Sequence, residues 1–478
     1  MSRRRLPLVP AGRPVVKAPP KPQGARFEKA RPPRVLLIAH NHPSLHPGGT
    51  EIFAHELFGG LKAAGAECLF LACTNDTHRT PRPGTGFQTL GRSADEVLLW
   101  AGHFDHFHQS QIDLHGLVPD LSNLLRAFRP DIVHIHHTLL LGVEMLFLIR
   151  RVCPDAKIVY TLHDYYPICA NDGQMVTTDN RKGADREGGN RALCDRATPD
   201  ACHRCFPDRP ADQFLLREKH IKAMFGLVDR FLSPSRFLRD RYVAWGLNPD
   251  RIEVMANSRP AVAAAPVREI ASGGRRDAFA YFGNLNPFKG VTVALDAVAR
   301  MARQGLDPAL SVHGGSLFQS AEFRQRVSEG FEAARGFATG HGPYRFQDMP
   351  ALMAAADWVL VPSVWWENAP LVIQEAFQHR RPVICSGIGG MAEAVRDGVD
   401  GLHVRPGDAA DLARVMTRAM TEPGLWERLS ANIPAVRPTE DAAALHLALY
   451  GELLAGPTPV QSASAISAPA FSMGNRTR

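Results

Sequence analysis

The sequence predicts an α/β protein made of two doubly wound domains that face each other across a cleft. Short apolar segments alternate with segments of helical apolar periodicity, and polar residues follow several of the apolar segments. The alternation stops at an Ala-, Pro- and Gly-rich stretch near residue 261 and then begins again. At 478 residues the chain is long enough for two complete hydrophobic cores.

The same features set the domain boundaries that we expect. The expected parts are a basic, Pro-rich disordered tail (1–32), an N-terminal domain (33–260) with a Cys-containing insertion (165–212), a linker (261–275), a C-terminal domain (276–437), a helix returning toward the N-terminal domain (438–456), and a Ser-, Ala- and Pro-rich disordered tail (457–478).

The positive charge of the chain is concentrated at its N-terminus. The formal net charge is +7, but residues 1–34 hold ten Lys or Arg and one Glu, which leaves 45 basic and 47 acidic residues elsewhere. This distribution does not indicate a nucleic-acid-binding fold. The basic tail is either an inert solvated extension or a segment that contacts anionic lipid.

Composition also indicates the compartment. No apolar run in the sequence approaches the ~20 residues of a membrane-spanning helix, and the N-terminus lacks the apolar segment of a secretory signal. Eight cysteines without an export signal favour a reducing environment. We therefore expect a cytoplasmic protein, with peripheral association at the inner face of the membrane as the alternative.

The N-terminal domain begins with a predicted strand over Arg34–His40. The loop that follows ends in Gly48-Gly49-Thr50, and Thr50 is expected to cap a helix over Glu51–Ala64. A strand, a Gly-containing loop and a helix N-terminus together form an anion site. The loop has no G-x-G-x-x-G pattern, so a dinucleotide-binding oxidoreductase is not indicated.

Two later strands of this domain end in histidines. The segments Asp131–His137 and Lys157–Asp164 place His136, His163 and Asp164 at their carboxyl ends, where α/β sheets bind ligands. Each histidine alone is more often a structural group, but two strands that both end in His favour a shared site. The other segments predicted here are strands at 68–72 and 230–233, a closing segment at 252–256, a helix at 236–245 and an irregular stretch at 75–120.

The C-terminal domain repeats the strand–helix alternation. The segments predicted for it are strands at 278–283, 309–313, 357–363 and 382–385, a closing segment at 401–404, helices at 291–304, 349–356, 371–379 and 391–396, and a final helix at 439–454.

The junction around Glu367 carries the strongest chemical signal. Glu367 follows the apolar strand at 357–363, and Glu375 lies about one turn into the next helix. The amides of Leu371 and Val372 are in the first turn of that helix, where N–H groups have no intrahelical partner and can bind an anion. Because carboxylates accept hydrogen bonds from sugar hydroxyls, this junction suits a nucleotide sugar. The alternative is two solvated glutamates.

Several motifs, in order along the chain, resemble those of the family-4 retaining glycosyltransferases, which have the GT-B fold of two Rossmann-like domains. The resemblance covers roughly residues 33–456. The matching motifs are Gly48-Gly49, His134-x-His136, His163-Asp164, Gly283 to Gly290, the E-x7-E pair Glu367 and Glu375, and Gly389-Gly390 with Glu393.

The resemblance implies roles for residues of the C-terminal domain. Glu375 matches the Glu that binds the donor ribose, and Glu367 matches the Glu that faces the transferred sugar. Lys289 matches the Lys that pairs with the diphosphate. Asn284 departs from the pattern because the family often has Arg there. It stays a donor-binding candidate, but the cation pair at the diphosphate is then reduced to Lys289 or completed by another Arg.

The resemblance also implies roles in the N-terminal domain and a reaction. His136 matches the His at the reaction centre, and His163 and Asp164 are supporting candidates. The amides at Gly48 and Gly49 share the phosphate charge with the Leu371 and Val372 amides. The implied reaction is metal-independent, retaining transfer of a sugar from a nucleotide-diphosphate sugar to a glycan or lipid-linked acceptor, in envelope or exopolysaccharide biosynthesis, with no cofactor required. The alternatives are a noncatalytic nucleotide-sugar-binding GT-B protein and a GT-B sugar phosphorylase.

Four cysteines cluster in the insertion of the N-terminal domain. Cys202 and Cys205 form a C-x2-C pair, the kind of knuckle that binds zinc, and Cys169 and Cys194 precede it at irregular spacing. The insertion has little apolar content and cannot build its own core. A structural zinc is favoured slightly over free thiols, with an iron–sulfur cluster as a further alternative.

Overall fold

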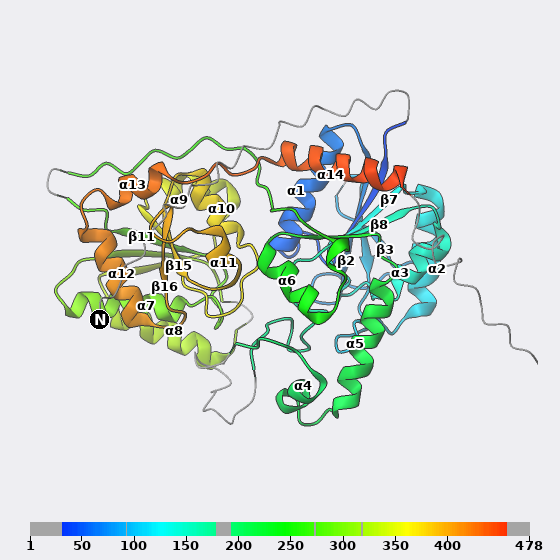
Figure 1. Ribbon diagram of the computed structural model, residues 1–478, viewed down its shortest axis with the longest axis horizontal. Coiled ribbons are helices and arrows are strands. Elements are labelled where there is room, and N and C mark those ends of the chain that lie inside the picture. The colour runs from blue at the N-terminus through cyan, green and yellow to red at the C-terminus, as the bar shows by residue number, and fades with distance from the viewer. Residues whose placement is uncertain (1–30, 92, 178–192, 272–273, 317–318, 457–478) are drawn as a thin grey trace, which may run out of the picture.

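The structure is a computed structural model that describes residues 31–91, 93–177, 193–271, 274–316 and 319–456. It contains two α/β units, each a twisted parallel sheet with helices on both faces (Figure 1). This confirms the predicted fold class of two doubly wound Rossmann-like domains. The two tails predicted to be disordered lie almost entirely outside the described residues.

Within the described residues, the N-terminal sheet has eight strands in the order β10-β9-β8-β7-β1-β2-β4-β3. All neighbouring pairs are parallel except β3 and β4. The strands are β1 (Arg34–Ala39), β2 (Glu67–Thr74), β3 (Phe87–Thr89), β4 (Glu96–Trp100), β7 (Ile132–Ile135), β8 (Lys157–Thr161), β9 (Arg230–Ser233) and β10 (Ile252–Val254), and a separate ribbon pairs β5 (Phe104–Asp105) with β6 (Ser110–Gln111).

The described part of the C-terminal sheet has six parallel strands in the order β13-β12-β11-β14-β15-β16. The strands are β11 (Ala278–Phe282), β12 (Ala309–His313), β13 (Ala338–Gly342), β14 (Trp358–Val361), β15 (Val383–Ser386) and β16 (Gly401–Val404).

Helices cover both faces of each sheet. Those of the N-terminal domain are α1 (Gly49–Ala63), α2 (Leu114–Phe128), α3 (Met145–Val152), α4 (Pro199–Cys205), α5 (Ala211–Phe225) and α6 (Arg236–Trp245). The others are α7 (Val291–Arg303), α8 (Ala321–Ala333), α9 (Met349–Ala354), α10 (Leu371–Gln378), α11 (Gly389–Ala394), α12 (Ala409–Thr421), α13 (Leu425–Ala431) and α14 (Thr439–Ala455).

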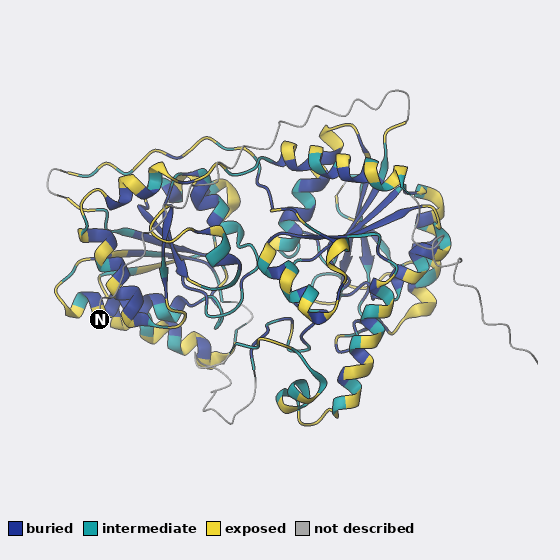
Figure 2. Cartoon of the chain, in the orientation of Figure 1, coloured by how far each residue is buried: buried dark blue, intermediate teal, exposed yellow. Residues whose placement is uncertain are grey.

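The strands are buried because helices pack on both of their faces (Figure 2). Every residue of β7, β8, β14 and β15 is buried, which explains why these strands read as continuous apolar runs and not as alternating ones. No helix in the described part of the chain is long and apolar enough to span a membrane.

The last helix, α14, lies against α1 of the N-terminal domain (Figure 1). A side chain at Gly60 would place its Cβ 2.9 Å from the Thr439 Cγ2 atom, so the small residue permits this close packing. The Tyr450 hydroxyl reaches inward to the His134 ring. The chain therefore crosses between the domains twice, once before β11 and once before α14.

Two local predictions were wrong. The stretch 75–120 is not irregular, since it holds β3, β4, the β5–β6 ribbon and the start of α2. Pro and Gly residues between these short elements concealed them. The helix predicted from Glu51 begins at Gly49, and Gly48 occupies the N-cap position without a side-chain hydrogen bond, so Thr50 is not the cap.

Candidate active site

Each sheet has one point at which the chain order reverses, and the candidate residues lie there. In the N-terminal sheet this point lies between β1 and β7, and in the C-terminal sheet between β11 and β14. Ligands of open α/β sheets bind at such switch points, outside the carboxyl ends of the strands. Lys289 and Glu367 come from the loops after β11 and β14, and His136 follows β7.

Lys289 and Glu367 form an ion pair across the C-terminal switch point. The Lys289 ammonium donates to Glu367 Oε1 at 2.6 Å. The Ser363 hydroxyl and the Trp365 indole N–H donate to the same oxygen, each at 2.9 Å. Burial alone would raise the pKa of Glu367, but Lys289 and these hydrogen bonds lower it below the usual range. The side chain is therefore a buried, preorganised carboxylate.

Gly290 is the residue that allows the Lys289 loop to lie against the end of β14. It has φ +74, and a Cβ there would lie 2.0 Å from the Pro362 carbonyl oxygen. Asn284, earlier in the same loop, is exposed. Its carbonyl accepts from the Tyr281 hydroxyl at 3.5 Å. Among the described residues, the Asn284 side chain has no hydrogen bond to Lys289 or Glu367.

Glu375 lies on the buried face of α10 and is held by an arginine that the sequence patterns did not reveal. Arg259 donates to Glu375 Oε1 and to Glu56 Oε1 of α1, each at 2.8 Å, and is fully buried. Burial raises the pKa of Glu375, and burial together with the nearby Glu375 charge raises the pKa of Glu56 to about 7. Arg259 thus joins α1, the interdomain segment and α10.

The histidine cluster lies at the carboxyl ends of β7 and β8. His136 Nδ1 is 3.0 Å from His163 Nε2. His136 is fully buried, whereas His163 is partly exposed. Burial lowers the pKa of His136 well below its usual value and that of His163 to about 3, so both rings are neutral at physiological pH.

The role of His136 at the reaction centre, expected from the sequence, stays a prediction. The His136 ring is fully buried in this conformation, and His163 lies between the interior and the surface. The other ring nitrogen of His136, Nε2, has no hydrogen-bond partner among the described residues. His134 lies two residues before His136 on β7. Its two ring nitrogens are hydrogen-bonded to the Tyr450 and Thr161 hydroxyls, at 2.7 Å each, so its role is structural.

Asp164 fixes the loop after β8. It accepts from the His137 Nε2–H at 2.9 Å and from the Tyr166 amide at 2.8 Å. His137 Nδ1 accepts from the Leu139 amide, which places the ring proton on Nε2. Burial would raise the pKa of Asp164, but His137 and these bonds lower it to about 2. Asp164 is therefore a supporting carboxylate for the loop that carries His163.

The N-terminus of α1 lies beside that of α10. The nearest heavy atom to a Cβ built on Gly49 is Leu371 Cδ1, at 3.8 Å, so the two helix starts meet across the domains. The first-turn amides of both helices are anion-binding groups. Gly48 has no room for a side chain because its Cβ would lie 2.4 Å from the Glu51 carboxylate.

Glu51 forms an ion pair that the sequence patterns also missed. His40 Nε2 lies 3.0 Å from Glu51 Oε1, and both side chains are largely buried. Burial would lower the pKa of His40, but Glu51 raises it, and His40 in turn lowers the pKa of Glu51. His40 directly follows β1, so the rule that polar residues at strand ends build sites could have found it.

Loops of the C-terminal domain contact this region directly. The Asn368 amide donates to the His163 carbonyl oxygen, and the Glu393 carboxylate accepts from the Arg236 and Phe237 amides at 3.0 and 2.8 Å, at the start of α6. Gly390 donates its amide to the Glu367 carbonyl at 2.7 Å. We call this region, which contains the Lys289–Glu367 pair, the starts of α1 and α10 and the His136–His163 pair, the domain junction. It brings the candidates of both domains together.

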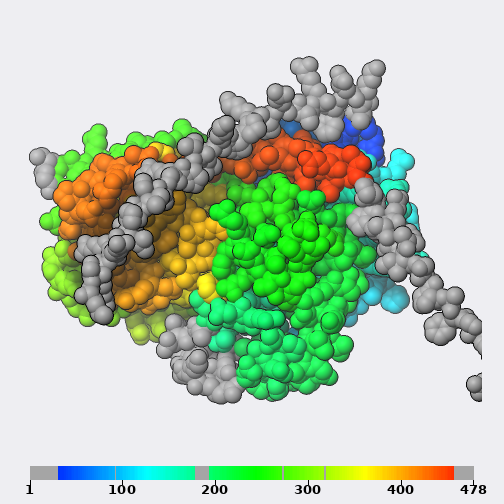
Figure 3. Space-filling view, viewed as in Figure 1, coloured from blue at the N-terminus to red at the C-terminus, as the bar shows by residue number. Residues whose placement is uncertain are grey.

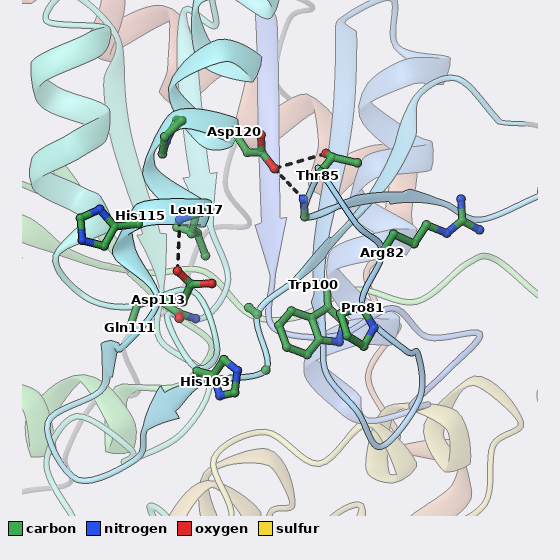
Figure 4. A pocket seen from close by; sticks show the side chains of 16 residues that line it. Pro81, Arg82, Thr85, Trp100, His103, Gln111, Asp113, His115, Leu117 and Asp120 are labelled. Carbon is green, nitrogen blue, oxygen red and sulfur yellow. Dashed lines mark hydrogen bonds between the residues drawn. The ribbon is translucent and has the colours of Figure 1, made fainter.

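A cavity of about 480 Å³ lies in the N-terminal domain, between the end of β4 and the start of α2 (Figure 4). Trp100, His103, Asp113 and Asp120 are among its lining residues. The Asp120 carboxylate already accepts from the Gly86 amide at 2.6 Å. Its mixture of aromatic and polar side chains suits a hydroxyl-rich ligand.

The insertion brings its four cysteines to one place. Cys169, Cys194, Cys202 and Cys205 line a separate cavity of about 110 Å³. In the described residues, one set of metal-ligand side chains has its ligand atoms within 4.8 Å of one another, and it is formed by His42, His55 and Glu96.

Comparisons with known proteins agree across both domains. A family model described as glycosyl transferases group 1 matches residues 276–422, and one described as glycosyltransferase family 4 matches residues 47–258. A glycogen synthase of Mycobacterium tuberculosis is 24% identical over 411 residues, which cover 83% of this chain and 88% of the relative. A D-inositol 3-phosphate glycosyltransferase of Salinispora arenicola is 31% identical over 216 residues, which cover 43% and 46%.

Solved structures share the fold at low identity. Sucrose-phosphate synthase of Thermosynechococcus elongatus has a TM-score of 0.61 at 18% identity and covers 89% of this chain and 100% of that chain. Anabaena HepE in complex with UDP and glucose has a TM-score of 0.56 at 15% identity and covers 90% and 99%. This likeness confirms the predicted GT-B arrangement of two Rossmann-like domains.

Proposed function

The chain belongs to the glycosyltransferases of group 1 and family 4, and from this we propose that it moves a sugar from a nucleotide-diphosphate sugar to a glycan or lipid-linked acceptor with retention of anomeric configuration. The observation that carries the proposal is the domain junction, where a Lys–Glu pair, two helix N-termini and a neutral histidine meet. The relative HepE binds UDP and glucose, which supports a nucleotide-sugar donor.

In this proposal the diphosphate binds between the N-termini of α1 and α10, next to Lys289. The first-turn amides of α1 and α10 meet at Gly49 and Leu371 and supply donors without charge. Lys289 is the nearby cation and is held by Glu367 at 2.6 Å. When the bond between the anomeric carbon and the phosphate oxygen breaks, negative charge develops on the departing diphosphate, and preorganised donors stabilise it.

Glu367 and His163 act on the sugar in this proposal. Glu367 keeps its charge despite burial, so it can accept from a sugar hydroxyl and oppose the positive charge that develops on the ring. His163 is neutral, partly exposed and held from behind by His136. It can donate to or accept from a sugar hydroxyl without becoming charged, and such positioning contributes several kcal/mol in favourable cases.

Retention follows if the acceptor hydroxyl attacks from the side that the diphosphate leaves. The new bond then joins the acceptor oxygen to the anomeric carbon on the same face, and the acceptor proton passes to the departing phosphate oxygen. This route needs no enzyme nucleophile and no metal. The N-terminal cavity near Trp100 and Asp120 is a candidate for part of the acceptor, and envelope or exopolysaccharide synthesis is the process that we propose.

The test is a screen of purified protein with nucleotide-diphosphate sugars and candidate acceptors. We expect nucleoside diphosphate release that depends on the acceptor, and a product whose anomeric configuration, read from proton coupling constants, matches the donor. An inverted product would contradict retention. Binding of the donor without release under any acceptor would favour a noncatalytic nucleotide-sugar-binding protein, and sugar-1-phosphate formation from a glycan and phosphate would favour a phosphorylase.

A further inference from the structure

The insertion between β8 and α5 converges on one small cavity lined by four cysteines. Cys169 lies in the turn that follows β8, Cys194 precedes α4, and Cys202 and Cys205 lie on α4 three residues apart, on one helix face. The cavity of about 110 Å³ has no carboxylate or histidine among its lining residues. We infer that this cavity is a structural zinc site with the four cysteines as thiolate ligands.

Backbone amides point at two of the sulfur atoms. The Asn171 and Met175 amides are directed at Cys169, and the Arg196 amide is directed at Cys194. In both cases one amide lies two residues after the cysteine. Hydrogen bonds from amides to sulfur stabilise a thiolate and orient it toward a metal ion. A neutral thiol in an apolar core has no need of them.

A buried cation lies next to the same cluster. Arg217 of α5 is 3% exposed and donates to the carbonyl oxygens of Phe107, Pro167 and Tyr166 at 2.6–2.8 Å. It also interacts electrostatically with Cys169 and Cys202. A zinc ion with four thiolates carries a net charge of two minus, so a fixed guanidinium beside it offsets part of that charge.

The alternative is four free thiols, of which Cys169 is buried and the other three are half-buried. Because the insertion has little apolar content of its own, the free energy of zinc binding becomes free energy of folding. An iron–sulfur cluster is less favoured because the usual run of closely spaced cysteines is missing.

The proposal includes a movement. Among the described residues, only His42, His55 and Glu96 bring three ligand atoms within 4.8 Å of one another, so the four sulfur atoms have to come closer together to hold an ion. Helix α4 has seven residues and projects with α5 from the lower edge of the N-terminal domain (Figures 1 and 3). In the proposal, α4 moves toward Cys169 and Cys194 when zinc binds.

The site has a structural purpose in the fold. The Tyr166 carbonyl accepts from both Arg217 and Gln109, at 2.6 Å each, and the Tyr166 amide donates to Asp164. Cys169 lies one turn further along the same loop. A metal at Cys169 therefore fixes the loop that carries His163 and Asp164, without taking part in the reaction.

The test uses full-length protein purified without added metal. We expect elemental analysis to find about one zinc per chain, and zinc-edge X-ray absorption to show only sulfur neighbours at about 2.3 Å. Cys202→Ser should lose the zinc and expose the segment around α4 to protease. Cys153→Ser removes a half-buried cysteine outside the cluster, and His55→Ala removes a ligand of the other set, so both should keep the zinc.

Several results would overturn the assignment. The assignment would be wrong if the protein contained no zinc and took up neither zinc nor cobalt. It would also be wrong if the protein contained iron, or if the four cysteines formed disulfides. A zinc ion bound by nitrogen and oxygen that remained in Cys202→Ser would contradict it as well. The zinc-edge X-ray absorption spectrum of the wild-type protein tests the assignment even if the variants fail to fold. Zinc content is measured without any donor or acceptor, so this result is independent of the proposed transferase activity.

Discussion

The most telling residue in the site is Glu367, because one of its oxygens accepts three hydrogen bonds while buried. These hydrogen bonds fix the Glu367 carboxylate in place before any charge develops on the substrate. Its partner Lys289 is then the group that forms a new ion pair when a diphosphate binds. Each side chain of the domain junction can therefore be tested for a distinct effect on binding, turnover or stability.

Glu375 is expected to contribute to donor binding. Glu375→Gln keeps the size of the side chain but removes the charge that orients ribose hydroxyls, so nucleoside diphosphate affinity should fall by roughly 1–3 kcal/mol. Titration calorimetry measures this. Glu329→Gln, an exposed position of the same domain, is the matched control. Equal affinity in both variants would remove Glu375 from the binding site.

The two histidines should behave differently. His163→Ala is expected to lower turnover on the order of a hundredfold, or about 2.7 kcal/mol, because it removes the ring nearest the surface. His136 acts through His163, so His136→Asn, which keeps a polar group near the same position, should recover more activity than His136→Ala. The readout is kcat with nucleotide affinity as the control. A larger loss for His136→Asn than for His163→Ala would reverse the assignment.

Glu56 gives a prediction about pH. Its pKa rises from 4.5 to about 7 on folding because burial and the Glu375 charge outweigh Arg259. The folded state therefore binds a proton more tightly, so this group stabilises the fold at low pH and loses that contribution as pH rises from about 4.5 to 7.

Denaturant unfolding of wild type and Glu56→Gln across this range measures the effect. The difference in unfolding free energy between the two proteins should change by roughly 1–3 kcal/mol between the ends of the range, with the variant gaining relative stability as pH rises. A pH-independent difference would show that Glu56 is already ionised in the fold at low pH.

At the scale of elements, the start of α11 packs against the loop between β14 and α10 through a contact that only glycine allows. A Cβ at Gly390 would lie 1.7 Å from the Asn368 carbonyl oxygen. Asn368 in turn donates to His163 of the other domain. The start of α11 therefore supports the loop that carries Glu367 and its contact across the junction.

Gly390→Ala should destabilise the protein by several kcal/mol, as strained backbone and clashing atoms do, and should lower donor affinity as well. Gly59→Ala is the matched control, since that glycine is exposed within α1 with no atom within 4 Å of its Cβ position. It should be neutral or stabilising by about 1 kcal/mol. Thermal unfolding compares the two. Similar stability in both variants would mean that the loop adapts freely.

Elements also show what the sequence could reveal. The buried strands β7, β8 and β14 were predictable as apolar runs, and the E-x7-E pattern placed Glu367 and Glu375 correctly relative to α10. The short strands β3, β5 and β6 were not, because three-residue and two-residue strands have no periodicity of their own. They form by pairing, β3 with β4 and β5 with β6.

At the scale of the whole molecule, the two domains are joined by residues that the sequence analysis had assigned to one domain only. Arg259 was expected at the end of the N-terminal domain, yet it bonds both α1 of that domain and α10 of the other. Glu393 belonged to a family motif, yet it caps α6 of the other domain. Such contacts depend on how the domains are placed, which no local pattern encodes.

The central claim is that the domain junction transfers a sugar from a nucleotide-diphosphate donor with Lys289 as the main cation. The direct measurement is nucleoside diphosphate release by wild type and Lys289→Ala, with matched melting temperatures, across a panel of donors and acceptors. We predict release by wild type with at least one donor and a loss on the order of a hundredfold or more in the variant. Equal release by both proteins, or no release by wild type with any donor, would contradict the claim.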